Sequence, residues 1–404
     1  GQSKTKIMSS TVDADRIQEI QEGKKSQEAK IRTLAQWVRK SRYTVFFTGA
    51  GISTSAGVGD YRGPSGAWTM GRIRELERLK VRGVISKAEA QELETLERER
   101  EKKGSQKSVP MIDAMPTATH MAMRTLIRRG IAHYVVTTNL DGIHRKSGLR
   151  AHKDICNLHG CVYAERCTGC GYDYERNYYT RKPNIHVHDH HIGACSKCGS
   201  KVPREYTGHP ASRNTGSDSE GFTEDRLVGT RDENVGTKDT HINFGECLDD
   251  IDWNEAETHC RKADLVIVAG TSMSLRHITH FPFMAKKTVI INLQQTPDDR
   301  RCHLRIWGKT DPVFELLMSE LKIQIDPISA WKPRDAVPLG KIPSYVRPFY
   351  VKAARRLQIK AAQLEREANE RQKEAKAEKE VQERAKLQKK RKKEALSMLE
   401  RVCM

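Results

Sequence analysis

Residues 44–68, TVFFTGAGISTSAGVGDYRGPSGAW, decide the fold of this chain. The β-branched and aromatic run at 44–47 predicts a buried strand, which stops at residues 49–51 (GAG), where small residues allow backbone amides to approach a phosphate. A strand that leads into such a loop is typical of a nucleotide-binding α/β protein. The dinucleotide fingerprint G-x-G-x-x-G/A is incomplete, because Thr54 stands in its third position and 60–62 (DYR) follows closely. The glycine pair alone is also typical of an ordinary tight turn.

Strands and helices alternate along the rest of the chain. Apolar spacing predicts a helical arm over residues 13–42, and a helix that starts at 116–117 and ends at 128–130 precedes a predicted strand at 131–138. Further elements are a helix at 253–263 and strands at 264–269 (DLVIVA) and 288–293 (TVIINL). This repetition predicts an α/β fold, a Rossmann-like doubly wound parallel sheet.

Composition and charge limit the class of protein. With 404 residues and 37% hydrophobic content, the chain can form two or three domains and at least one well-filled core. Its formal net charge of +19 favours binding to nucleic acid, an acidic membrane leaflet or an acidic protein surface. Ten cysteines without a hydrophobic signal peptide indicate a reducing compartment and a metal site rather than disulfides. No apolar run approaches the ~18 residues of a membrane span.

Four of the cysteines form two pairs. Two residues separate Cys167 from Cys170 and Cys195 from Cys198, and the 24 residues 171–194 lie between the pairs. Two such pairs supply four thiolates in tetrahedral geometry, the ligand set of a closed structural zinc site. We therefore predict one structural Zn²⁺ on these cysteines. Histidines in the intervening segment are alternative ligands in principle, but a solvated polar loop explains them better.

Polar residues follow several predicted strands. Asn139 and Asp141 come where a strand ends, and ligands of open α/β sheets gather at the carboxyl ends of strands, although Asn-x-Asp-Gly is also a common turn. Residues 270–272 (GTS) and Asn292 end two further strands and can reach phosphate oxygens and a ribose, respectively. His159 has an imidazole suited to proton transfer, although a single histidine is more often structural or exposed.

Three further segments differ in composition. Residues 72–103, rich in Glu, Arg, Lys and Leu, predict a charged helical hairpin with its turn near Gly83, which is more simply a solvated insertion than a binding surface. Residues 207–240 have scarcely an apolar side chain and predict a loop or a disordered segment. Residues 327–404 predict a proline-containing linker and then a basic, charged helix with a fading heptad typical of a coiled coil and a basic run at 389–393.

The order of these motifs resembles one family. GAGIS, DYRGPSGAW, TNLDG, LHG, two C-x-x-C pairs, NFGE, GTS and a strand-ending IN together resemble the sirtuin family of NAD-dependent protein deacylases, over residues 44 to about 325. Residues 119–123 (THMAM), 140–149 (LDGIHRKSGL) and 291–299 (INLQQTPDD) look most like the class IV branch, which has nuclear, nucleolar and chromatin-associated members.

The resemblance implies a division into domains. It consists of an N-terminal helical arm (1–43), a catalytic domain (44–326) and a linker with a basic helical tail (327–404). Within the catalytic domain, the Rossmann-like parts are 44–155 and 246–326, the small inserted zinc-binding module is 156–206 and the polar insertion is 207–240.

The resemblance also implies the residues of an NAD site. They are Gly49, Ala50, Gly51, Ser53, Thr54, Tyr61, Arg62, Trp68, Thr138, Asn139, Asp141, Gly270, Thr271, Ser272, Asn292, Gln294 and Thr310. Asn139 and Asp141 would grip the nicotinamide carboxamide, and Asn139 would be catalytic together with His159. An acyl-lysine would pair its backbone with the strand around Asn243, Phe244, Gly245 and Glu246.

The implied reaction releases the acyl group from lysine. The acyl oxygen would attack the ribose carbon as nicotinamide leaves, and His159 would then act as general base on the ribose hydroxyls, which needs a pKa near the working pH. The products would be free lysine, nicotinamide and an O-acyl-ADP-ribose.

Three departures from the family pattern bear on this expectation. Thr138 stands where the family usually has Gln, whose longer amide contacts the ribose. Gly59 stands where Pro is usual, so the loop over NAD costs more entropy to order. The insertion at 207–240 lies just ahead of the substrate strand and can cover or gate the acyl-lysine tunnel. We therefore expect NAD binding to be more robust than turnover.

Alternative functions remain open at this level. The leading hypothesis is an NAD-dependent deacetylase or deacylase; the others are a mono-ADP-ribosyltransferase and a weak or inactive sirtuin-fold subunit of a ribonucleoprotein, cytoskeletal or ciliary assembly. Expected locations are the nucleus, including nucleolus and chromatin, or else the cytoplasm, cytoskeleton or cilium. The basic tail is expected to bind nucleic acid or an acidic protein surface. Residues 1–5 fit an N-myristoylation pattern, but a leading glycine is also a common remnant of cloning.

Overall fold

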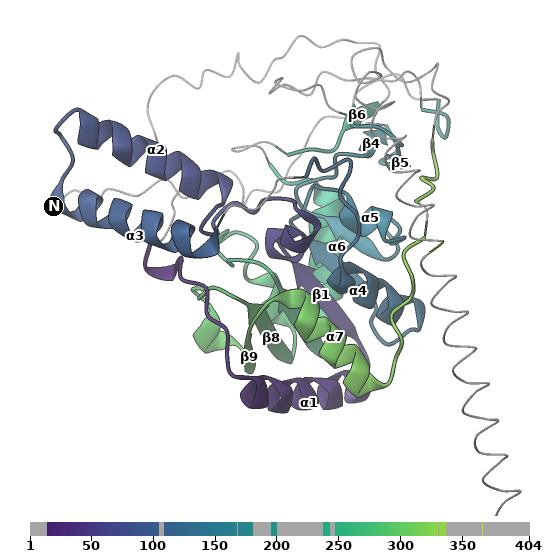
Figure 1. Cartoon of the computed structure of the whole chain (residues 1–404). Helices are drawn as coiled ribbons and strands as arrows, with labels where there is room; N and C mark the ends of the chain where they lie inside the picture. Colours follow the sequence, from purple (N-terminus) through teal and green to yellow (C-terminus); the bar gives the residue numbers. More distant parts are fainter. Residues whose placement is uncertain are drawn as a thin grey trace, which may run out of the picture. The chain divides into compact units, whose positions relative to one another are not determined.

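A computed structural model (Figure 1) describes residues 14–104, 109–167, 169–180, 195–199, 237–242, 247–329, 331–336 and Arg366. One compact unit is formed by Gly1–Asp326 and Trp331–Ala353, and a second comprises Pro327–Ala330 and Ala354–Met404. The predicted coiled coil, the basic run at 389–393 and the N-terminal acylation pattern lie outside the described residues, as does most of the polar insertion.

A six-stranded parallel sheet forms the centre of the first unit. Its strand order is β3-β2-β1-β7-β8-β9, which is the doubly wound arrangement that the sequence predicts. The bounds are β1 Thr44–Thr48, β2 Tyr134–Thr137, β3 Ile155–Asn157, β7 Leu265–Ala269, β8 Lys287–Asn292 and β9 Leu304–Trp307. The central strand β1 pairs with both neighbours, with Val45 opposite Tyr134 on one side and Val266 on the other. Strands buried on both faces explain the near-continuous apolar runs.

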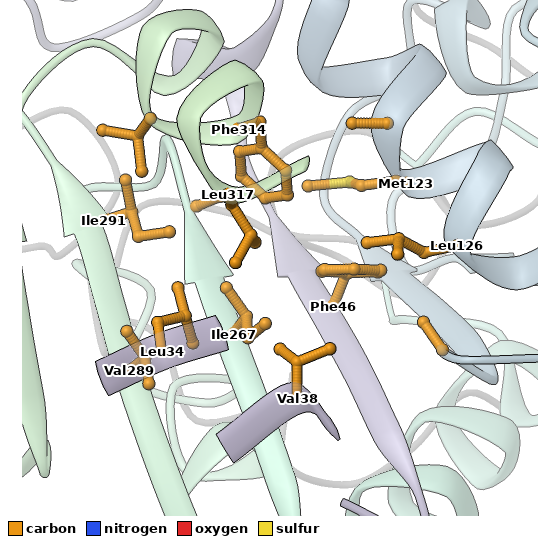
Figure 2. Close-up of a cluster of buried hydrophobic side chains, with 14 of the residues drawn as sticks. Leu34, Val38, Phe46, Met123, Leu126, Ile267, Val289, Ile291, Phe314 and Leu317 are labelled. Carbon is orange, nitrogen blue, oxygen red and sulfur yellow. The ribbon is translucent and has the colours of Figure 1, made fainter. Parts of the chain in front are cut away.

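Helices cover both faces of this sheet. The helices are α1 Lys24–Lys40, α2 Ala67–Val81, α3 Lys87–Lys103, α4 Ala118–Arg128, α5 Ile143–Lys146, α6 Asp250–Lys262 and α7 Thr310–Leu321. Because side chains alternate along β1, Phe46 joins the core beneath α1, α4 and α7, whereas Val45 and Phe47 join the core beneath α6. Figure 2 shows Phe46 among side chains from three helices, including Leu34, Met123 and Phe314.

A helical hairpin, α2 and α3, confirms the prediction for residues 72–103. Ser86 caps α3 in a capping box with Glu89, and the turn between the helices contains Gly83, whose φ of +69° is the left-handed region that favours glycine. The two helices bury their own small cluster, in which Leu76 and Leu96 are fully enclosed. In Figure 1 the hairpin projects from the sheet. Its base, not its tip, therefore reaches the rest of the unit.

A smaller antiparallel sheet carries the cysteine pairs. Its order is β5-β4-β6, with β4 at Ala164–Cys167, β5 at Asp173–Glu175 and β6 at Thr237–Asp239. The last of these strands is a difference from the expectation for 207–240, which was a loop throughout. Three polar residues there are strand because Glu165, Arg166 and Cys167 of β4 supply hydrogen-bonding partners.

Within the described residues, we find no helix that has both the length and the apolar character of a membrane span.

Candidate active site

A cavity of about 1070 Å³ opens at the carboxyl ends of the central strands. The loops that follow β1, β2, β7 and β8 all contribute to its wall, through residues 49–51, 138–140, 270–275 and 292–294. This edge of a doubly wound sheet, where neighbouring loops diverge, is the usual ligand site of the fold. The volume is slightly above the usual ~300–1,000 Å³ of small-molecule and cofactor sites, which is enough for a dinucleotide-sized ligand.

Three glycines allow the loops after β1 and β7 to approach each other. A Cβ at Gly49 would lie 2.6 Å from Cβ of Thr271, and one at Gly51 would lie 2.8 Å from the Gly270 carbonyl oxygen. Gly270 itself has a φ of +61°, and the Gly51 amide donates to its carbonyl at 2.7 Å. A side chain at any of these positions would push the two backbones apart, which explains the spacing of the G-x-G motif.

Asn139, Ser53 and Asp141 form a hydrogen-bonded chain at the cavity wall. The Asn139 amide donates to the Gly49 carbonyl at 3.1 Å and to Oγ of Ser53 at 3.3 Å, and that hydroxyl donates to the Asp141 carboxylate at 2.7 Å. Burial raises the pKa of Asp141, although the hydrogen bonds from Ser53 and from the Ile143 amide oppose this shift. Asn139 lines the cavity. Ser53 and Asp141 do not line it; they lie behind Asn139 and hold its side chain in position.

His159 lies at the wall with a defined tautomer. Its Nδ1 is 3.0 Å from the Thr138 carbonyl oxygen, which can only accept a hydrogen bond, so Nδ1 carries the proton and Nε2 has the lone pair. Burial, followed by the charges of His277, His241 and Arg62, lowers the pKa of His159 to about 4, whereas the bond to Thr138 raises it. The imidazole is therefore neutral at physiological pH, with a pKa below the range that we expect for a general base.

Arg62 contributes a partly buried cationic group to the cavity wall. Its guanidinium lies 4.0 Å from the centroid of the Trp68 ring, whose centroid is 5.1 Å from that of Tyr61. The Nε atom is buried without a hydrogen-bond partner in the described part of the chain, and burial lowers the pKa of Arg62 to about 10. A buried cation without a partner is costly unless a ligand supplies one. The negative diphosphate of NAD fits this need.

Side chains beyond β8 close the other end of the cavity. Asn292 donates to the Gln294 carbonyl at 3.0 Å, and the Gln294 amide donates to the carbonyls of Ile17 and Arg62 at 2.9 and 3.3 Å. Gln294 therefore ties the N-terminal arm to the loop that carries Arg62. Thr310, at the start of α7, lines the same end.

Thr138 and Gly59, the two departures from the family pattern, have distinct surroundings. The Thr138 hydroxyl donates to the Thr48 carbonyl at 3.2 Å, so it extends the pairing of β1 and β2 rather than projecting like a longer amide. A Cβ at Gly59 would meet no atom within 4 Å, and Gly59 is not among the glycines with positive φ.

The structure brings most of the predicted cofactor residues to one cavity. Those that line it are Gly49, Ala50, Gly51, Thr54, Tyr61, Arg62, Trp68, Thr138, Asn139, His159, Gly270, Thr271, Ser272, Asn292, Gln294 and Thr310. The predicted substrate residues Asn243, Phe244, Gly245 and Glu246 lie outside the described residues. Sequence reasoning missed His241 and His277 at the wall. Both lie close to a motif, His241 two residues before the predicted substrate strand and His277 five residues after GTS, but a single histidine is more often structural or exposed and so did not stand out.

The four predicted zinc ligands form one cluster. The Sγ atoms of Cys167 and Cys198 are 3.7 Å apart, and those of Cys170 and Cys195 are 3.8 Å apart. Tetrahedral Zn²⁺ with Zn–S bonds of ~2.3 Å requires edges of ~3.8 Å. The amides of Gly169 and Cys170 donate to Cys167 Sγ at 3.3 and 3.4 Å, which stabilises a thiolate. The donor set and its spacing fit one structural zinc ion.

Together these features define a dinucleotide-binding α/β protein with a structural zinc module. A family model described as the Sir2 family matches residues 49–277. The chain belongs to this family, as the motif order in the sequence predicts, and NAD is the cofactor that the family and its named relatives use.

Curated relatives agree with this assignment. NAD-dependent protein deacetylase SRT1 of Arabidopsis thaliana is 32% identical over 74% of this chain and 51% of its own length. NAD-dependent protein deacetylase sirtuin-7 of Homo sapiens is 29% identical over 78% of this chain and 66% of its own length. The chain thus spans about half to two thirds of these two relatives. Similarity to sirtuin-7 fits the expected closeness to the class IV branch. A solved structure of Sir2 bound to acetylated peptide covers 73% of this chain and 99% of its own, with 22% identity and a TM-score of 0.44.

Proposed function

We propose that this chain is an NAD-dependent protein-lysine deacylase that forms nicotinamide and an O-acyl-ADP-ribose. The observation that carries the proposal is His159, a neutral imidazole with a fixed tautomer at the wall of a cavity that the glycine loops and Asn139 also line. Family membership and the relatives named as NAD-dependent deacetylases support the same activity.

When bound, NAD supplies an electrophilic ribose carbon and nicotinamide as the leaving group. The chain's own residues position and move protons: Nε2 of His159 accepts a proton while the Thr138 carbonyl keeps its ring in place. The low pKa shows that an imidazolium is unfavourable here before NAD binds. Because a diphosphate brings negative charge into the cavity, we expect it to raise the pKa of His159 towards the working pH.

In this proposal the remaining site residues hold the cofactor and the substrate. The guanidinium of Arg62 and the amide of Ser272 would bind phosphate oxygens, and Asn139 would orient the carboxamide. The acyl-lysine would lie beside Ile242, whose amide donates to the His159 carbonyl at 3.1 Å and whose side chain lines the cavity. This contact supports a proposed substrate strand that begins next to His159.

Nicotinamide release tests the activity. The protein is mixed with NAD and an acetylated or long-chain-acylated histone peptide, alongside His159→Ala, and calorimetry measures NAD binding to both. We expect a loss of about 10²–10⁴-fold in the variant, the usual contribution of a general base, with NAD binding retained. Equal release from both proteins would refute the role of His159. No release from either, with NAD bound, would favour the second candidate.

That second candidate is a weak or inactive sirtuin-fold subunit of a larger assembly. It is favoured by Thr138, because its hydroxyl is bound to the Thr48 carbonyl where the family's longer amide contacts the ribose. Thr138→Gln distinguishes the two candidates. An increase in nicotinamide release shows an active but impaired enzyme, whereas an unchanged absence of release, with NAD still bound, supports a structural role.

We also propose a domain division, a location and a partner for the tail. The domains are 1–43, 44–326 and 327–404. The location is the nucleus, and the tail binds nucleic acid or an acidic protein surface. The net charge of +19 and the basic run at 389–393 support the last two. Deletion of residues 351–404 should flatten the salt dependence of binding to a duplex DNA probe. An unchanged slope would exclude the tail as the contact.

A further inference from the structure

Residues 331–336, which lie in the predicted proline-containing linker, pack on the zinc module. We call this segment the strap. It belongs to the same compact unit as the parallel sheet and the module. Its contacts fall into two groups, a polar anchor on β5 and an aromatic contact with Tyr163. The proposed reaction assigns no role to either group.

The polar anchor holds the strap on β5. The Glu175 amide donates to the Asp335 carboxylate at 3.0 Å, and the Asp335 amide donates to the Glu175 carbonyl at 3.1 Å. Arg176 donates to the Asp335 carbonyl at 3.2 Å, and Arg334 donates to the carbonyl of Asp173. Because β5 is an edge strand of the described sheet, its outer backbone groups are available for this pairing.

Trp331 extends the contact from the anchor into the apolar interior of the module. Its ring centroid lies 4.8 Å from that of Tyr163, with an angle of 60° between the ring planes. The Tyr163 side chain is buried, and Trp331 and Ile112 pack against the small cluster that contains it. Edge-to-face aromatic pairs contribute ~0.5–1.5 kcal/mol beyond the area that they bury. Trp331 therefore favours one orientation of the Tyr163 ring.

Tyr163 in turn lies against the loop that follows β2. Gly142 has a φ of +73°, and a Cβ there would lie 2.2 Å from Cδ2 of Tyr163, so the ring is in direct contact with the loop backbone. The Val162 amide donates to the Leu140 carbonyl at 2.9 Å, and Leu140 lines the cavity. The segment that carries Tyr163 thus holds the backbone of the loop 139–142.

Lys146 connects the same ring to a second part of the cavity wall. Its ammonium group lies 5.1 Å from the centroid of the Tyr163 ring. It donates to the carbonyls of Met111, Ile112 and Ala114 at 2.9, 2.9 and 3.1 Å, and Met111 lines the cavity. The Tyr163 ring therefore supports two segments of the wall, and displacement of the ring would disturb both.

We propose that Trp331 is a positioning residue for NAD, which acts through Tyr163 on the loop that carries Asn139 and Asp141. The inference rests on the proposed function, in which Asn139 orients the nicotinamide carboxamide. Trp331 is not among the residues that line the cavity, so it acts on the geometry of the loop and not on the ligand itself. Only the nicotinamide end of NAD would meet this loop. We therefore expect Trp331 to affect the binding of NAD but not that of ADP-ribose, which lacks nicotinamide.

Calorimetry with NAD and with ADP-ribose tests this role without turnover. The zinc-loaded full chain and Trp331→Ala are titrated with each ligand in the absence of an acylated peptide, and zinc content is measured in both proteins. Loss of one well-oriented hydrogen bond to the carboxamide weakens binding about tenfold, so we expect the NAD affinity of the variant to fall by that factor. The affinity for ADP-ribose should change by less than about twofold, as for a site without a shared contact.

Three further variants separate positioning from general stabilisation. Trp331→Phe keeps an aromatic ring against Tyr163 and should retain most of the NAD affinity. Asp335→Ala keeps both rings but loosens the anchor, so it should lower NAD affinity by a smaller factor. Trp37→Ala is the matched control, because Trp37 is also half-buried but packs against the core beneath α1, α4 and α7. It should lower the free energy of unfolding and leave the ratio of NAD to ADP-ribose affinity unchanged.

The following outcomes overturn the inference. Unchanged NAD affinity in Trp331→Ala, with zinc retained, would mean that the loop is held without the strap. An equal loss of NAD and ADP-ribose affinity, or the same change of ratio in Trp37→Ala, would show a general effect on stability. If Trp331→Ala does not fold, Asp335→Ala decides, and an unchanged ratio there refutes the inference.

The proposed deacylase activity fails on a different result. Wild-type protein that binds NAD but releases no nicotinamide in the presence of an acylated peptide would refute the activity and leave the comparison of NAD with ADP-ribose intact. Wild-type protein that binds neither ligand would refute both proposals.

Discussion

The parallel sheet and the zinc module are held together by different forces. Strands β1, β2 and β7 of the sheet are buried along their whole length, and their side chains belong to two large apolar cores. Among the described residues, the module has only two small apolar clusters, one around Cys167, Tyr174 and Cys195 and one around Tyr163 and Ala164. We therefore expect a bound metal and polar contacts to contribute much of its stability, as in other small units with limited apolar burial.

Polar contacts join the module to the sheet. Arg166 of β4 forms ion pairs with Asp173 of β5 and with Asp249 and Asp252 near the start of α6, the first and third of these at 2.6 and 2.8 Å. His152 adds bonds to Asp173 and Glu255. The group formed by His152, Asp252 and Glu255 resembles a metal site, but Arg166 already pairs with one of its two acidic members, Asp252, and His152 with the other. This network therefore acts as a salt-bridged joint.

Metal removal is expected to produce the largest difference in stability between the module and the sheet. Structural zinc contributes ~10–16 kcal/mol in isolated zinc-finger peptides, so a chelator or Cys195→Ala should unfold the module, whose apolar cluster is too small to replace that contribution. The sheet should persist, because its two cores contain no metal ligand. Hydrogen exchange checks this outcome: protection should be lost in β4 and β5 and retained in β1 and β7. Simultaneous loss in both regions would show that the module and the sheet fold as one cooperative unit.

A cavity created in the apolar core should destabilise the sheet and leave the zinc site intact. Phe46 is fully buried among Phe314 and side chains from α1 and α4, and its ring centroid is 5.9 Å from that of Phe314 (Figure 2). Phe46→Ala should lower the free energy of unfolding of the sheet by ~3–5 kcal/mol, because a large side chain is lost and the cavity can collapse only partly. Urea denaturation followed by tryptophan fluorescence measures this change. Zinc content, measured in the folded variant, should remain one ion per chain.

The effect of pH on the stability of the joint should be smaller than the effects of metal removal and of Phe46→Ala. Burial lowers the pKa of His152, but its hydrogen bonds to Asp173 and Glu255 outweigh this and raise the pKa to about 10. A raised folded-state pKa means that the contribution to stability is complete below the unfolded value of ~6.5 and is lost as the pH rises through about 10. Each hydrogen bond to a charged group contributes ~1.5–3 kcal/mol.

The corresponding measurement compares the zinc-loaded wild type with His152→Gln between pH 6.5 and 10. The wild type should lose stability across this window, and the variant should start lower and change less. Arg150→Gln is the control, because the exposed Arg150 forms an ion pair with Asp154 outside the joint. Parallel curves for the wild type and His152→Gln would mean that His152 is not protonated in the joint.

The same contrast explains what the sequence could predict. Strands such as β7 and β8 are visible because burial on both faces demands an apolar run, and the zinc site is visible because metal geometry fixes the cysteine spacing. The short strand β6 is not visible, since its conformation depends on pairing with β4 rather than on its own composition.

The candidate site shows the same limit. Motif order located the glycine loops and His159, but the low pKa of His159 depends on burial and on neighbours as distant in sequence as His277. The bond from Thr138 to the Thr48 carbonyl likewise depends on the pairing of two strands. These properties arise from tertiary contacts, which no local pattern encodes.

Gly59, in the loop beside the cavity, tests the backbone entropy that the family usually limits with proline. A Cβ at Gly59 would meet no atom within 4 Å, and its φ is not positive, so neither a clash at Cβ nor a left-handed φ opposes proline. Gly59→Pro should stabilise the loop by ~0.4–1 kcal/mol by reducing the freedom of the open chain. That free energy corresponds to a two- to fivefold gain in NAD affinity by calorimetry. Gly71→Pro, inside α2, is the contrasting variant: Gly71 also has open space at Cβ, but proline there removes a helical hydrogen bond, so it should destabilise the hairpin. Weaker NAD binding in Gly59→Pro would mean that the loop must flex to admit the cofactor, and that its freedom serves binding rather than opposing it.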